Sequence, residues 1–122
     1  MKSFLLVFLG GGLGSGLRYL VASAMNQYSK VLPFGTFTVN MLGCLLIGMI
    51  LGYAQKENTL TSNQTLLLAT GFCGGFTTFS AFANENLELI KNGEIFNFSV
   101  YTIGSVLIGI LAVCIGFFLT NR

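Results

Sequence analysis

The feature that most constrains this sequence is a series of four apolar runs, each about as long as a bilayer is thick. A membrane-spanning helix needs about 20 mainly apolar residues. Only 8% of the residues are charged, whereas soluble domains have roughly 25%. The sequence therefore predicts an all-α, multi-pass protein of the cell (inner or plasma) membrane, with one integral membrane domain over residues 1–122. The four transmembrane helices are expected at about 4–25, 34–54, 65–84 and 96–119.

Residues that start and stop helices lie between these runs. Pro33, the one proline of the chain, suits the start of the second helix. Thr61 or Ser62 can cap the third helix, and Gly93 follows that helix in a short turn. These positions predict four helices joined by short connectors.

The supply of reactive side chains argues against an enzyme. The sequence contains no histidine and no aspartate. Hydrolytic or metal-dependent catalysis is therefore not expected, because the commonest general base and metal ligand is missing. The four acids are Glu57, Glu85, Glu88 and Glu94.

Basic residues are divided almost evenly between the two ends of the predicted bundle. Four spans put both termini on one side, and an excess of Lys and Arg on one side normally sets orientation. The near balance predicts insertion in both orientations, and hence an antiparallel, dual-topology homodimer with a two-fold axis in the membrane plane. One side has Lys2, Lys56 and Arg122; the other has Lys30, Lys91 and, if its side chain reaches outward, Arg18.

Glycine is frequent within the runs and often recurs at a spacing of four. Small residues at this spacing let helix backbones approach closely in lipid. Packing is favoured over a nucleotide-binding loop, because the first glycine cluster does not satisfy GxGxxG and no GK[ST] follows it. The pairs are Gly10 and Gly14, Gly12 and Gly16, Gly48 and Gly52, and Gly71 and Gly75.

The third run contains a segment that no ordinary spanning helix needs, Gly71-Phe-Cys-Gly-Gly-Phe-Thr-Thr-Phe-Ser-Ala-Phe82. In a bilayer, broken backbone survives only where it is buried in protein or lines a polar pathway. We therefore expect the third helix to be broken here, and the function to lie at the break. Carbonyl groups of Gly74, Gly75 or Thr77, freed at the break, need a partner, and a cation is one candidate.

Polar and aromatic side chains accompany the predicted break. Thr77, Ser80 and Asn84 recur at helical spacing as a polar stripe, which Glu88 extends. Beside the stripe we expect an aromatic ridge, whose partly positive ring edges can face an anion that is losing water. Packing in the core or against lipid is the alternative for each ring. The ridge comprises Phe72, Phe76 and Phe79, with Phe82 close by.

Several polar residues lie deep in the other runs. Arg18 either draws anions into an aqueous vestibule or is a structural anchor. Asn40, one turn after Thr36, either offers its amide to an ion or joins two helices by a hydrogen bond. Tyr101 and Ser105, one turn apart, either form a short polar track or are hydroxyls satisfied within the fold.

These motifs resemble those of CrcB/Fluc-type fluoride channels, over essentially the whole chain. The resemblance implies a passive channel that exports fluoride from the cell and so relieves its toxicity. It also implies two pores in an antiparallel homodimer, each lined by both subunits. The matching segments are Gly10-Gly-Gly-x-Gly14 with Arg18-Tyr19, Gly35-Thr-x-x-x-Asn40-x-x-Gly43, and Gly71–Phe82 with Glu85, of which the third is the most specific.

The resemblance further implies roles for individual residues. Gly74 and Thr77 would give backbone carbonyls to a structural sodium ion, shared by the subunits at the two-fold axis. Arg18 would lie near a vestibule and Glu85 near a pore mouth. The fluoride pore would be lined by Asn40, Thr78, Phe79, Ser80, Phe82, Tyr101 and Ser105.

Two positions depart from the family pattern, and two other functions compete with it. Ala81 stands where the family usually has a hydroxyl, and Gly109 stands one turn beyond Ser105, where a further hydroxyl is expected. A small dual-topology multidrug-type transporter is the alternative function, but it needs a membrane-embedded acid, and the first run has none. A structural subunit would not need Asn and Phe beside a mid-membrane break.

Overall fold

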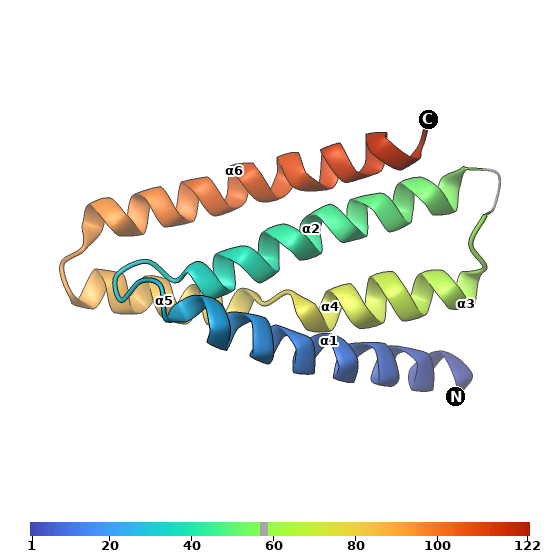
Figure 1. Cartoon of the computed structure of the whole chain (residues 1–122), viewed down its shortest axis with the longest axis horizontal. Coiled ribbons are helices and arrows are strands. Elements are labelled where there is room, and N and C mark those ends of the chain that lie inside the picture. Colours follow the sequence, from blue (N-terminus) through green and yellow to red (C-terminus); the bar gives the residue numbers. More distant parts are fainter. Residues whose placement is uncertain (57–58) are drawn as a thin grey trace.

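The protein is a bundle of long helices lying side by side (Figure 1). The computed structural model describes residues 1–56 and 59–122, so Glu57 lies outside the described residues. Within the described residues, four helical segments are long and apolar enough to cross a membrane, as predicted. They comprise Lys2–Asn26, Phe34–Gln55, Ser62–Lys91 and Ile95–Thr120.

The third segment is interrupted, whereas the other three are continuous helices. Figure 1 shows the chain passing back and forth along the bundle, with both termini at the same end. The prediction of a broken third helix is therefore confirmed. The continuous helices are α1 (Lys2–Asn26), α2 (Phe34–Gln55) and α6 (Ile95–Thr120). The third segment consists of α3 (Ser62–Thr65), a π-helix η1 (Leu66–Cys73), α4 (Gly74–Phe76) and α5 (Phe79–Lys91).

The helix ends follow the local signals of the sequence. Pro33 is the N-cap of α2. Thr61 caps α3 through a capping box, because its hydroxyl accepts from the Gln64 N–H while the Gln64 side chain accepts from the Thr61 N–H. Gly93 has a φ of +74°, a left-handed conformation that suits glycine and reverses the chain before α6.

Glycines bring α1 into backbone contact with the third segment. A Cβ on Gly14 would overlap the carbonyl oxygen of Phe72, and one on Gly75 would overlap the carbonyl oxygen of Gly11. No larger residue fits at either position without moving backbone. Close approach of this kind replaces the hydrophobic driving force that helices lack in lipid.

A second glycine contact joins α2 to α6. A Cβ on Gly48 would overlap the carbonyl oxygen of Val113, and one on Gly52 would overlap that of Phe117. The predicted packing role is thus confirmed for three of the four glycine pairs. Gly12 and Gly16 differ, because no atom of another described element lies within 4 Å of a Cβ at either position.

Replacing Gly14 with alanine is expected to destabilise the fold, with Gly12→Ala as the matched control. Both substitutions gain the same helix propensity, but only the Cβ at position 14 meets backbone. We expect Gly14→Ala to be less stable than Gly12→Ala by roughly 1–3 kcal/mol, the usual cost of overpacking. Equilibrium unfolding in detergent measures the difference. Equal stabilities of the two variants would contradict the proposed contact.

Candidate functional site

The break in the third segment consists of two extended residues, Thr77 and Thr78. Their φ and ψ angles are −85° and 159° for Thr77, and −149° and 125° for Thr78. Gly74 and Gly75, which were expected to belong to the break, are helical in α4, so that detail of the prediction is wrong. The physical reason is that β-branched threonine favours extended backbone, while Gly75 is needed for helix contact with Gly11.

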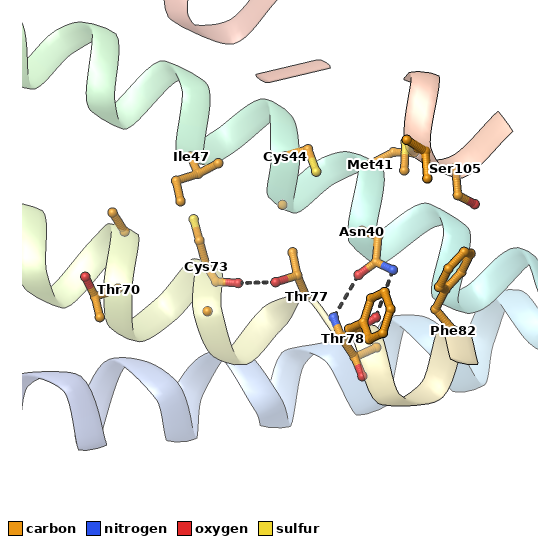
Figure 2. Close-up of a pocket in the computed structure, with 15 residues that line it drawn as sticks. Asn40, Met41, Cys44, Ile47, Thr70, Cys73, Thr77, Thr78, Phe82 and Ser105 are labelled. Carbon is orange, nitrogen blue, oxygen red and sulfur yellow. Dashed lines mark hydrogen bonds between the residues drawn. The ribbon is translucent and has the colours of Figure 1, made fainter. Parts of the chain in front are cut away.

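The side-chain amide of Asn40, on α2, pairs with the backbone of the break. Its Nδ2 donates to the Thr78 carbonyl oxygen at 3.0 Å, and its Oδ1 accepts from the Thr78 N–H at 2.8 Å (Figure 2). Both backbone groups of Thr78 are therefore satisfied in the interior of the bundle. An amide nitrogen has two hydrogens, and the second makes no hydrogen bond to any described residue. Whether this hydrogen meets an ion stays a prediction.

The two threonine hydroxyls of the break cap the helices on either side. The Thr77 hydroxyl donates back to the Cys73 carbonyl oxygen at 2.9 Å. The Thr78 hydroxyl accepts from the Ala81 N–H at 3.2 Å and so caps α5, and it lies 3.2 Å from the Ser80 hydroxyl oxygen. The Thr–Thr pair therefore both ends one helix and starts the next.

The break leaves carbonyl groups without helical partners, as a helix end does. The Gly75 carbonyl oxygen accepts from Arg18 Nε at 3.0 Å and from the Ser15 hydroxyl at 3.3 Å. In the described part of the chain, the carbonyl oxygens of Gly74 and Thr77 accept no hydrogen bond. No group of three His, Cys, Asp or Glu side chains among the described residues is placed to hold a metal.

A cavity of about 560 Å³ lies beside the break, between α2, the third segment and α6 (Figure 2). Asn40, Thr78 and Ser105 are among the residues that contribute polar groups to it, and Phe79 and Phe82 contribute aromatic wall. The fold thus gathers these five predicted pore residues at one site. The remaining lining is Met41, Gly43, Cys44, Ile47, Ala69, Thr70, Cys73, Gly74, Thr77 and Val106.

The phenylalanines form two separate groups rather than the single predicted ridge. Phe72 and Phe76 stack on each other, with ring centroids 5.7 Å apart. Beyond the break, Phe82 lies between Phe79, at 5.7 Å, and Tyr101, at 5.0 Å. The ridge prediction is wrong because the extended residues of the break interrupt the helical spacing on which it depended.

The predicted polar stripe is also interrupted. Thr77 is extended and lies outside α5, so it does not share a helix face with Ser80 and Asn84. Those two residues are exposed on α5 and do not line the cavity. Glu88 is exposed and pairs with Lys91 at 3.2 Å. Only the α5 part of the stripe therefore exists as a continuous surface.

Three buried side-chain oxygens lack a hydrogen-bond partner among the described residues: Glu85 Oε1, the Tyr101 hydroxyl and Ser105 Oγ. Glu85 lines a smaller polar pocket of about 260 Å³ near the turn between α1 and α2. Tyr101 contacts Phe82, and Ser105 lines the large cavity. Buried polar groups normally have partners, so each of these three oxygens is free to bond a water molecule or an ion.

Sequence reasoning missed one polar residue at the break and most of the apolar cavity wall. Ser15 bonds the same carbonyl oxygen as Arg18, and the signal was its position three residues before that arginine. Met41, Cys44 and Ile47 line the cavity from α2. Nothing in a uniformly apolar run distinguishes such residues from lipid-facing ones.

Comparison with known proteins finds relatives that match nearly the whole sequence. Residues 5–117 match the family model described as "CrcB-like protein, Camphor Resistance (CrcB)". The chain is 49% identical to a fluoride-specific ion channel FluC of Phocaeicola vulgatus, over 99% of this chain and 100% of that protein. It is 43% identical to the FluC of Flavobacterium psychrophilum and 46% identical to that of Gloeothece citriformis, in each case over 100% of this chain and 99% of the relative.

Replacing Asn40 with leucine is expected to destabilise the break even without fluoride. The change leaves both backbone groups of Thr78 unpaired, and each such group costs about 1–3 kcal/mol. We expect a loss of roughly 2–5 kcal/mol in unfolding free energy, measured in fluoride-free detergent solution. The same substitution at Asn84, exposed on α5, is the control and is expected to change stability by less than about 0.5 kcal/mol. Equal effects at the two positions would rule out the Asn40 pairing.

Proposed function

This chain belongs to the CrcB-like protein family, and from that membership we propose that it is a fluoride-specific ion channel through which fluoride leaves the cell passively. The observation that carries the proposal is similarity along essentially the full length to proteins named as fluoride-specific channels. The chain is a multi-pass membrane protein, and we place it in the cell (inner or plasma) membrane. The multidrug-type alternative needs an acid in the first span, and α1 has none.

The cavity at the break supplies what a fluoride ion requires. Fluoride is small and strongly hydrated, so a pore has to replace its water with hydrogen-bond donors and positive edges, weakly enough for release. The second amide hydrogen of Asn40 and the hydroxyl of Ser105 supply donors at this site. The ring edges of Phe79 and Phe82 supply partial positive charge. We expect larger anions to be excluded by the width of the path in the assembled channel.

Glu85 and Tyr101 extend this path toward the end of the bundle. Their buried oxygen atoms lack partners in the described chain. The Tyr101 hydroxyl can donate to a passing anion, and the half-buried Glu85 borders the polar pocket at the proposed pore mouth. Thr78 and Ser80, whose hydroxyls lie 3.2 Å apart, belong to the same proposed path.

We further propose that the working unit is an antiparallel homodimer. Phe79 is 78% exposed in the single chain although it lines the cavity. Thr70 and Gly74 are exposed on the same cavity wall. Irregular backbone is not stable against lipid, and an inverted second copy would cover the break. The near balance of Lys and Arg favours such insertion in both orientations.

A structural sodium ion fits the carbonyl groups that the break frees. The oxygens of Gly74 and Thr77 accept no hydrogen bond in the described chain, and both line the cavity. Neutral oxygen atoms suit a hard cation, and the C-terminal end of α4 has partial negative charge. When bound between two copies, the ion would tie their breaks together at the two-fold axis.

Fluoride efflux from liposomes containing the purified wild-type protein tests the proposed function directly. Once a potassium ionophore balances the charge, fluoride is expected to leave while chloride stays, as read with ion-selective electrodes. A structural subunit would release neither ion. Retention of fluoride by well-assembled protein would overturn the proposal.

Replacing Phe79 with isoleucine is expected to lower fluoride efflux by roughly tenfold, because about 1.4 kcal/mol of ring-edge stabilisation is lost along the path. Phe96→Ile is the matched control, since Phe96 is 79% exposed but lies outside the cavity. Chemical cross-linking shows whether both variants still dimerise. Unchanged efflux in assembled Phe79→Ile protein would remove this ring from the pore.

A further inference from the structure

One face of α1 follows the broken segment up to the break. Gly11, Ser15 and Arg18 recur at i, i+4 and i+7, so they lie on the same side of the helix. Gly11 touches Gly75 backbone to backbone. That contact brings the next two turns of α1 alongside the end of α4, where Ser15 and Arg18 both reach the Gly75 carbonyl oxygen.

The Gly75 carbonyl is a group that the break deprives of its partner. In an unbroken helix it would accept from the N–H four residues later, but Phe79 already begins α5 beyond the break. The end of α4 also bears the partial negative charge of a helix C-terminus. A guanidinium and a hydroxyl therefore converge on a carbonyl that the break has deprived of its helical donor.

Arg18 has this carbonyl, rather than a carboxylate, as its partner. The one ion pair in residues 1–56 and 59–122 is between Lys91 and Glu88. Nor does Arg18 line the large cavity or the polar pocket near Glu85. Its position therefore differs from that of a residue that attracts anions into either space.

We propose that Arg18, assisted by Ser15, is a positioning residue for conduction, which acts through the Nε hydrogen bond to Gly75 rather than through its charge. Asn40 holds the break from α2 at Thr78, and Arg18 holds it from α1 at Gly75, three residues earlier. Together the two bonds fix the helical halves relative to each other, and so fix the cavity residues on both sides. This inference rests on the proposed fluoride conduction.

Two substitutions at position 18 separate the hydrogen bond from the charge. The amide nitrogen of glutamine is as many bonds from Cα as arginine Nε, so Arg18→Gln keeps a donor and loses the charge. Arg18→Met has similar length and no donor. We expect Arg18→Gln to keep efflux within about threefold of wild type. Arg18→Met is expected to lose about tenfold or more, because the Gly75 carbonyl oxygen then keeps only the longer hydrogen bond from Ser15.

The fluoride concentration at half-maximal flux distinguishes positioning from anion attraction. If Arg18 positions the break, Arg18→Met lowers the maximal flux and Arg18→Gln leaves the half-maximal concentration unchanged. If its charge attracts fluoride, both variants raise that concentration alike and the flux depends strongly on ionic strength. The second result would overturn the inference. Arg18→Gln alone decides between them if Arg18→Met does not assemble.

Ser15→Ala provides an independent arm of the experiment. The hydrogen bond from the Ser15 hydroxyl to the Gly75 carbonyl oxygen is longer than the bond from Arg18. We therefore expect Ser15→Ala to lose about two- to fivefold in flux. Ser23→Ala, at an exposed position on the same helix, is the control and should match wild type. Equal flux in the two serine variants would remove Ser15 from the proposal.

Hydrogen–deuterium exchange over residues 74–80 tests the positioning without measuring transport. Exchange should rise in Arg18→Met and stay near wild type in Arg18→Gln, because only the former frees the end of α4. Unchanged exchange in assembled Arg18→Met protein would overturn the inference. If wild-type protein conducts no fluoride, the proposed function fails instead, and the exchange result shows separately whether Arg18 orders the break.

Discussion

The structure depends on one pairing, in which the side-chain amide of Asn40 replaces the helical hydrogen bonds of the Thr78 backbone. A peptide group without a partner costs several kcal/mol in the membrane interior, so an interrupted helix persists there only if neighbours replace the missing bonds. Asn40 is suited to this because one amide offers both a donor and an acceptor, which match the carbonyl and N–H of a single residue. The cavity lies beside the break, so its position depends on the hydrogen bonds between Asn40 and Thr78.

The rest of the bundle keeps that pairing in place. The glycine contacts between α1 and the third segment and between α2 and α6 make two tightly packed helix pairs. The break lies in the first pair, where it is bonded to α1, and it is also bonded to α2 of the second pair. Few side chains are fully buried, Val39 and Cys73 being the largest. Backbone contact at glycine, rather than a large side-chain core, therefore positions the functional residues.

The sequence predicted the parts of the fold that depend on composition and spacing within one helix. The four spans, the cap at Thr61 and the turn at Gly93 follow from local physical rules. The exact site of the break did not, because Gly74 and Gly75 suggest flexibility, whereas both are helical in α4 and Gly75 packs against Gly11 of α1. Which residue ends a helix here depends on partners distant in the sequence.

The candidate site, too, could be predicted only where it does not depend on contacts between residues distant in the sequence. Asn40, Thr78, Phe79, Phe82 and Ser105 were identified, and the fold gathers them around one cavity. The aromatic ridge and the polar stripe failed because both extrapolated a helical period through residues that are extended. The partnership of Ser15 with Arg18 was not predicted, since it depends on how close α1 comes to the third segment.

The pairing of Thr78 within a single chain has a consequence for biogenesis. Since both of its backbone groups are satisfied by Asn40 of the same polypeptide, the interruption does not wait for another molecule in order to form. Each newly inserted chain can therefore form the paired break by itself. Association into the proposed dimer would then resemble the docking of preorganised bodies, with little ordering entropy left to lose on encounter.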